Sequence, residues 1–196
     1  FGKRLYRRPL SAAEKARSLN ARSAIAVTVL ACIEQDRGHE RLHEGADPSE
    51  DLARAKALFE RARELEPDDP LLLCNLASVH RTLAEWLMAT GGDPGEPHRE
   101  AMTIYEEAIR VSPRFLEAAY CLGETHSTYG AWLDGAGRDP TPQYEAACTA
   151  LRRALALRPD HGPTLESIVT VLWRLGRRSL LMGLDPRKGF APALDA

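Results

Sequence analysis

A fixed spacing of 46 residues runs through this chain and constrains its fold more than any other feature. Three prolines stand at this spacing, namely Pro67, Pro113 and Pro159. Asp-Pro pairs repeat in step with them, and the pairs are Asp47-Pro48, Asp93-Pro94, Asp139-Pro140 and Asp185-Pro186. A period between about 20 and 50 residues is typical of one supersecondary unit stacked on copies of itself.

Each repeat is predicted to contain two helices. In the copy that begins at Leu116, apolar and small residues recur at spacings of three and four, as on one face of an α-helix. Asp139 and Pro140 then provide a cap and a preset backbone angle for a second helix. Pro159 ends that helix, because the residue before a proline is disfavoured in helical geometry. We therefore expect an all-α chain, an α-solenoid of stacked antiparallel helix pairs.

The register also predicts where the elements lie. Residues 1–8 are expected to form a basic linker, and residues 9–196 a repeat domain that starts with a lone helix over 9–21. The helix pairs are expected over residues 24–66, 70–112, 116–158 and 162–196, with hinges at 45–48, 91–94 and 137–140.

The second helices share a pattern of small and large apolar residues. One copy has Ala101, Tyr105, Ala108 and Pro113, and two others have Ala55, Phe59, Ala62 and Pro67, then Ala147, Leu151, Ala154 and Pro159. Together with Leu122-Gly123 on a first helix, these residues resemble the tetratricopeptide repeats (TPR). The resemblance implies a TPR-like superhelix and a protein–protein interaction module. Its concave groove would be lined by the first helix of each repeat.

The repeats are longer than those of the family, which have about 34 residues. The added residues lengthen mostly the first helix. Elongated repeats with Gly-x-Asp-Pro hinges also resemble the C-terminal helical regions of some bacterial serine/threonine protein kinases. That resemblance implies a regulatory or scaffolding part of a larger signalling protein. The chain itself has no glycine-rich phosphate loop and no H-R-D or D-F-G motif, so we expect no kinase activity from it.

The groove residues follow from the TPR resemblance, in which first-helix positions pointing away from the second helix face a partner. The residues expected at such positions are Thr28, Gln35, Arg81, Tyr120, Glu124, Trp173 and Arg174. Aromatic residues and arginine are enriched at binding hot spots, and the carboxylates favour a protein or peptide partner with basic residues. The Lys and Asn residues with which some family members bind a C-terminal carboxylate do not occur at these positions.

Residues 39–43 have the sequence H-E-x-x-H, which in zinc hydrolases places two ligands and a general base on one helix. No third ligand follows at the spacing of that class, and Glu40 stands at the repeat position that holds Trp86 and Trp132 in other copies. We therefore expect no catalytic residue, no metal, no cofactor and no enzymatic activity. A zinc-dependent hydrolase stays open as an alternative, and a self-associating architectural spacer is another.

Composition and the distribution of charge argue against other classes of protein. The 196 residues are 44% hydrophobic and 28% charged, as in ordinary folded domains. No apolar run approaches the roughly 20 residues of a membrane span, so no membrane insertion is expected. Basic residues gather at the two ends rather than along one helix face, which argues against a nucleic-acid partner. Four cysteines without a C-x-x-C pair favour a reducing cytoplasm, and the absence of an initiator Met suggests a piece of a longer protein.

Overall fold

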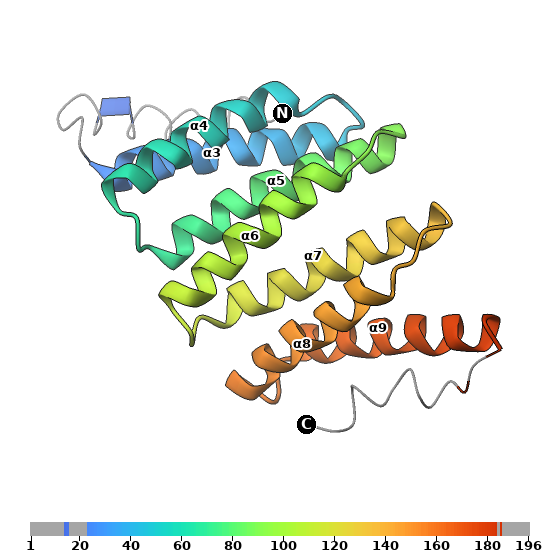
Figure 1. Cartoon of the computed structure of the whole chain (residues 1–196). Helices are drawn as coiled ribbons and strands as arrows, with labels where there is room; N and C mark the ends of the chain where they lie inside the picture. The colour runs from blue at the N-terminus through green and yellow to red at the C-terminus, as the bar shows by residue number, and fades with distance from the viewer. Residues whose placement is uncertain (1–13, 16–22, 184, 186–196) are drawn as a thin grey trace. The chain divides into compact units, whose positions relative to one another are not determined.

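The computed structural model describes residues 14–15, 23–183 and 185, and in these ranges it contains helices and no strand (Figure 1). The labelled helices are α3 (Ala24–His43), α4 (Ser49–Leu65), α5 (Pro70–Thr90), α6 (Gly95–Val111), α7 (Leu116–Gly135), α8 (Thr141–Leu157) and α9 (Gly162–Leu181). The predicted all-α fold class is confirmed. The linker expected over 1–8, most of the helix expected over 9–21 and the end of the pair expected over 162–196 lie outside the described residues.

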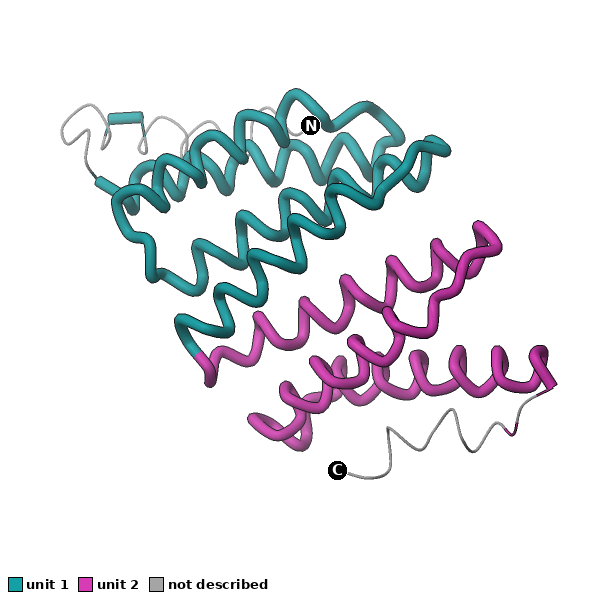
Figure 2. Tube along the Cα trace, in the orientation of Figure 1, with its two compact units in different colours: residues 1–112 teal, residues 113–196 magenta. Residues whose placement is uncertain are grey.

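The chain divides into two compact units, residues 1–112 and residues 113–196 (Figure 2). In the first unit α3 pairs with α4 and α5 pairs with α6, while α5 also packs against α3 and α4. In the second unit α7 pairs with α8, and α9 packs against both. Each unit is therefore a stack of antiparallel helices, as the repeat register predicts.

The turns at the ends of the first helices share one construction. Gly45, Gly91, Gly137 and Gly183 have φ angles of 70°, 79°, 70° and 69°, a region that glycine adopts without strain. After the first three, the Asp carboxylate accepts a hydrogen bond from the backbone N–H two residues later, as in Asp47 Oδ1 and Ser49 N at 2.8 Å. The proline between them is the N-cap residue, whereas the Asp was expected to be, so each of these second helices begins one residue later than expected. The reason is that the Asp side chain spans the proline in an Asx turn.

Small residues let the two helices of a pair approach closely. A Cβ atom added to Gly123 would come within 2.6 Å of the Leu151 side chain, and one added to Gly130 within 2.7 Å of the Tyr144 ring. The alanines of the repeat pattern on the second helices are completely buried, and they are Ala55, Ala62, Ala101, Ala108, Ala147 and Ala154. Close backbone contact around these residues forms the core of each pair.

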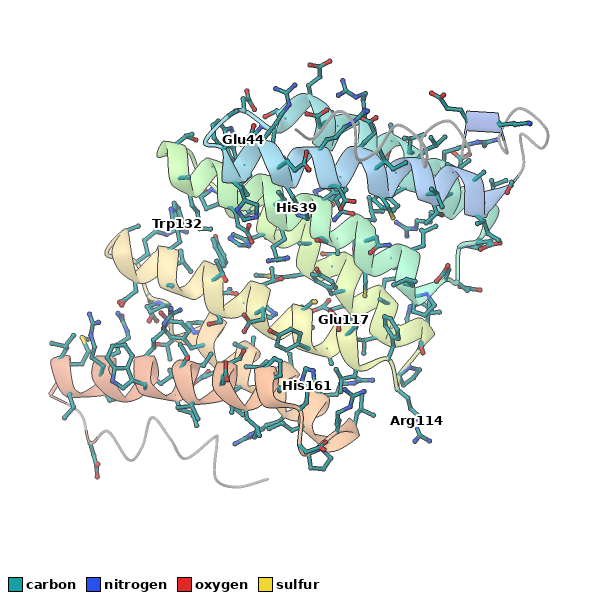
Figure 3. All side chains as sticks on the ribbon, turned by 180° about the vertical axis from the view of Figure 1, so that it is seen from behind. His39, Glu44, Arg114, Glu117, Trp132 and His161 are labelled. Atoms are coloured by element: carbon teal, nitrogen blue, oxygen red, sulfur yellow. The ribbon has the colours of Figure 1, made fainter. Side chains whose placement is uncertain are left out.

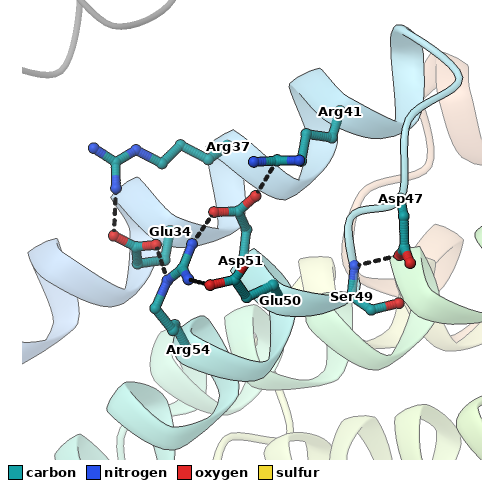
Figure 4. Close-up of polar contacts among 8 residues, drawn as sticks. All are labelled: Glu34, Arg37, Arg41, Asp47, Ser49, Glu50, Asp51 and Arg54. Carbon is teal, nitrogen blue, oxygen red and sulfur yellow. Dashed lines mark hydrogen bonds and ion pairs between the residues drawn. The ribbon is translucent and has the colours of Figure 1, made fainter.

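A cluster of charged side chains joins α3 to α4 in the first unit (Figure 4). The carboxylate of Asp51 is buried and pairs with Arg54 of its own helix and with Arg41 of α3, whose Nε lies at 2.5 Å. Arg54 also donates from Nε to Glu34 of α3 at 2.8 Å. A buried carboxylate is costly unless it is paired, so these contacts fix how the two helices meet.

Candidate functional site

The second unit contains a cleft between α7 and α9 with a volume of about 380 Å³. Both helices are the first of their repeats and run in the same direction (Figure 1). The lining is largely polar, and the side chains that give it its chemical character are Tyr120, Glu124, Ser127, Glu166, Thr170 and Arg174. The cleft thus combines an aromatic ring, hydroxyl groups and charges of both signs.

The repeat register explains why these residues share one surface. Tyr120 and Glu124 are four residues apart on α7, and Glu166, Thr170 and Arg174 continue the same spacing on α9. Side chains four residues apart lie on one helix face. The second helix of the pair, α8, packs instead against the face of α7 that carries the glycines of the core contact.

Tyr120 forms the wall of the cleft near the beginning of the two helices. Its ring packs against the core between α8 and α9, and it meets the ring of His161 edge to face with centroids 5.4 Å apart. His161 Nδ1 lies 2.6 Å from Thr164 Oγ1, which holds the imidazole in place. Burial, reinforced by the nearby carboxylate of Glu124, raises the pKa of the Tyr120 hydroxyl, which therefore stays neutral. Figure 3 labels His161 and Glu117 at this end of the unit.

Arg174 lies further along the cleft and is held by neutral groups. Its Nη1 donates to the backbone carbonyl oxygen of Ser127 at 3.1 Å, and its guanidinium carbon lies 5.9 Å from the centre of the Tyr144 ring. Arg178, one turn further along α9, pairs with Asp134 and Asp139 at 3.2 and 3.0 Å. Of the three α9 arginines, Arg174 is the one that lines the cleft, since Arg177 lies over the Trp173 ring and Arg178 pairs with aspartates.

Two carboxylates complete the site, one from each helix. Glu124 on α7 is half-buried, whereas Glu166 on α9 is exposed. The hydroxyl of Thr170 donates to the backbone carbonyl oxygen of Glu166 at 3.0 Å, so the Thr170 hydroxyl points back along α9. With a fixed ring, hydroxyls and charges but an open surface, the arrangement is suited to binding a chain segment.

The structure brings together Tyr120, Glu124 and Arg174 from the seven residues expected to face a partner. Trp173 is 59% exposed and is not among the lining residues, and the guanidinium carbon of Arg177 lies 5.6 Å from the centre of its ring.

Thr28, Gln35 and Arg81 belong to the first unit, on α3 and α5. Gln35 is buried, Thr28 is half-buried, and Arg81 pairs with Glu85 within α5 at 2.7 Å.

Sequence reasoning missed Ala131 of the lining on α7. It also missed Pro163 and Ser167 on α9. Pro163 and Ser167 are four residues apart. They form a row of side chains on α9 next to the row of Glu166, Thr170 and Arg174. Extending the same spacing to this neighbouring row would have found them, because two adjacent rows of side chains face a neighbouring helix.

The H-E-x-x-H segment occupies the end of α3. His39 Nε2 lies 2.6 Å from the Thr82 hydroxyl, which itself donates to the carbonyl oxygen of Ser78, so the imidazole donates to the hydroxyl. His43 is exposed. In the part of the chain that the structure describes, no group of three or more His, Cys, Asp or Glu side chains could hold a metal ion. None of the described helices is both long enough and apolar enough to span a membrane.

Comparison with known proteins gives matches at the level of structure. No family model and no curated protein sequence matches the chain. The crystal structure of MamA superposes with a TM-score of 0.58 at 16% identity, over 95% of this chain and 85% of that one. The TPR domain of Sgt2 from Aspergillus fumigatus gives 0.52 at 14% identity, over 76% and 82%.

A further similar structure is the second TPR domain of human RPAP3, solved in complex with an HSP70 peptide. It gives a TM-score of 0.50 at 15% identity, over 76% of this chain and 98% of that one. Similarity at these identities concerns the fold alone. Taken with the 46-residue register and the paired helices, it shows that this chain has a tetratricopeptide-repeat-like fold.

Proposed function

We propose that this protein is a protein–protein interaction module that binds a peptide segment of a partner in the cleft between α7 and α9. The observation that carries the proposal is the convergence of Tyr120, Glu124 and Arg174 from two helices on one open cleft. A ring held by packing and a guanidinium held by hydrogen bonds lose little conformational entropy when a ligand binds. Aromatic and arginine side chains are also those that most often dominate binding energy.

The hydroxyl groups suit the backbone of a bound segment. Ser127 and Thr170 are short side chains that do not fill the cleft. The Ser127 hydroxyl can donate a hydrogen bond to a ligand, and the Thr170 oxygen can accept one while its O–H donates to Glu166. The RPAP3 domain, which shares the fold, was solved with a peptide bound. Both points favour an extended or helical segment of a protein over a small metabolite as the ligand.

The other residues expected to face a partner are proposed as additional contacts. Thr28, Gln35 and Arg81 would contact a partner in the first unit. Trp173 would contact it from α9, next to Arg174 in the sequence. We assign Gln35 and Arg81 smaller contributions, because the first is buried and the second already pairs with Glu85.

The proposed setting is a regulatory or scaffolding part of a larger cytoplasmic signalling protein without enzymatic activity of its own. It rests on the resemblance of the Gly-x-Asp-Pro hinges to helical regions of bacterial serine/threonine kinases. The open reading frame upstream of the codon for Phe1 tests it, since a kinase domain encoded there supports this setting and an unrelated domain contradicts it.

The binding proposal is tested by capturing partners from the native cell extract on immobilised protein. We expect Tyr120→Ala and Arg174→Ala to lose at least about tenfold in capture, since hot-spot truncations cost about 2 kcal/mol or more. Arg99→Ala is a matched control, because Arg99 is exposed on α6. Equal capture by all four proteins would contradict the assignment of the cleft, provided that circular dichroism gives the same helix content for each.

A further inference from the structure

We infer that the cleft recognises charge in a fixed order along its ligand. A Lys or Arg side chain of the bound segment lies where α7 and α9 begin, and an Asp or Glu side chain lies two to four residues along, beside Arg174. This inference rests on the proposed function and adds to it the chemical class and the orientation of the peptide.

The acidic part of the cleft surrounds an aromatic ring. Glu166 stands at the same repeat position on α9 as Tyr120 on α7, and Glu124 lies one turn further along α7. The two carboxylates therefore come one from each helix of the cleft, and both line it together with the ring. A cation placed among them meets two negative charges and the face or edge of a fixed phenol, which suits an ammonium or guanidinium group.

The cationic part of the cleft is Arg174. Its described contacts are the carbonyl oxygen of Ser127, the hydroxyl of Ser127 at 3.5 Å and the ring of Tyr144, and all three are neutral. A guanidinium has five N–H donors, more than these contacts use, so it can still take a carboxylate.

The two parts do not neutralise each other in the structure. Among the described ion pairs, none joins Arg174 to Glu124 or Glu166. Charges that are separated along one cleft favour a ligand with the complementary order. A ligand bound in reverse would place like charges together, which is unfavourable, so the order also sets the orientation.

Helix geometry sets the spacing of the two charges on the ligand. Glu166 and Arg174 are eight residues apart on α9, which corresponds to about 12 Å along a helix axis. Glu124 is level with Thr170, four residues before Arg174, or about 6 Å. An extended peptide advances about 3.3 Å per residue. A basic residue and an acidic residue separated by two to four positions therefore match the cleft.

The experiment is selection of a display library of random short peptides on the wild-type protein, on Tyr120→Ala and on two charge variants of the cleft. In Glu124→Gln combined with Glu166→Gln, the acidic part becomes neutral without a change in side-chain size. In Arg174→Gln, the cationic part becomes neutral. Glu145→Gln on α8 and Arg99→Gln on α6 are matched controls, because both positions are exposed outside the cleft.

We expect wild type and both controls to enrich peptides that pair Lys or Arg with Asp or Glu at the stated spacing. The double Glu variant should lose the basic preference several-fold and keep the acidic one, and Arg174→Gln should do the opposite. Peptides that are enriched on wild type but not on Tyr120→Ala, and that show no preferred order of basic and acidic residues, would overturn this inference. They would leave the proposed function standing. Enrichment of no peptide on wild type, or of peptides indifferent to Tyr120→Ala, would overturn both.

Discussion

At the scale of single residues, the close contact between α7 and α8 depends on the absence of a side chain at Gly123. A larger residue at Gly123 must displace Leu151, and overpacking of this kind typically costs about 1–3 kcal/mol. We predict that Gly123→Leu lowers the free energy of unfolding by that amount in urea denaturation. Gly135→Leu in the same helix is the control, because a Cβ atom there meets nothing within 4 Å. Equal losses for the two variants would contradict the packing account.

Two histidines of the first unit, the half-buried His39 and the buried His80, predict a pH dependence of stability. Burial lowers the pKa of His39 and of His80 below the ordinary value of 6.5, with Arg81 and Lys56 respectively adding to the effect. The unfolded chain then binds more protons than the folded chain just below that value, so stability falls as the pH drops from about 6.5 toward the lower folded pKa values. His80→Gln should flatten this fall. Denaturation midpoints at about pH 7 and pH 5.5 measure it, and an unchanged slope would contradict the assignment.

Several residue-level expectations could be made from the sequence because they depend on periodicity alone. The buried alanines and the cleft residues Tyr120 and Glu124 follow from counting positions in each repeat. Trp173 could not be placed in this way. It stands at the repeat position of Ser127, which faces α9, but within the described part of its unit no later helix covers it. The same position is therefore buried in one repeat and exposed in the next.

At the scale of helices, the contact between α3 and α4 depends on the charged cluster around Asp51. Asp51→Asn removes the ion pairs with Arg41 and Arg54 at a buried site. Both arginines are almost half exposed, so solvent screening reduces the loss, and we expect about 1–3 kcal/mol in urea denaturation. Glu50→Gln removes an exposed pair with the same Arg54 and should cost no more than about 0.5 kcal/mol. A similar loss in both variants would contradict a special role for the buried carboxylate.

The helices themselves were predictable because caps and hinges are local signals, whereas the charged contacts between helices were not. Arg178 stands at the repeat position of Trp86 and Trp132, and nothing in the sequence indicates a partner for its charge. In the structure it pairs with Asp134 and Asp139 at the turn after α7. Which carboxylates a long side chain reaches depends on the crossing of two helices, and a repeat alignment does not contain that information.

At the scale of the whole molecule, we expect the H-E-x-x-H segment to support no metal-dependent reaction. His39, the first residue of the H-E-x-x-H segment, hydrogen-bonds to Thr82 of α5. We predict well under one zinc ion per chain in elemental analysis of protein purified without an affinity tag. We also expect a chelator to leave the melting temperature unchanged. Stoichiometric zinc that is lost in His39→Ala or His43→Ala would instead favour the hydrolase.

The central claim is that partner segments bind between α7 and α9. The most direct measurement is a nuclear magnetic resonance titration of isotope-labelled protein with a peptide from a captured partner. The account predicts that the largest shifts occur over residues 120–131 and 163–174, and that Tyr120→Ala weakens binding at least about tenfold. Shifts concentrated on α8 or in the first unit, with binding unaffected by Tyr120→Ala, would contradict it.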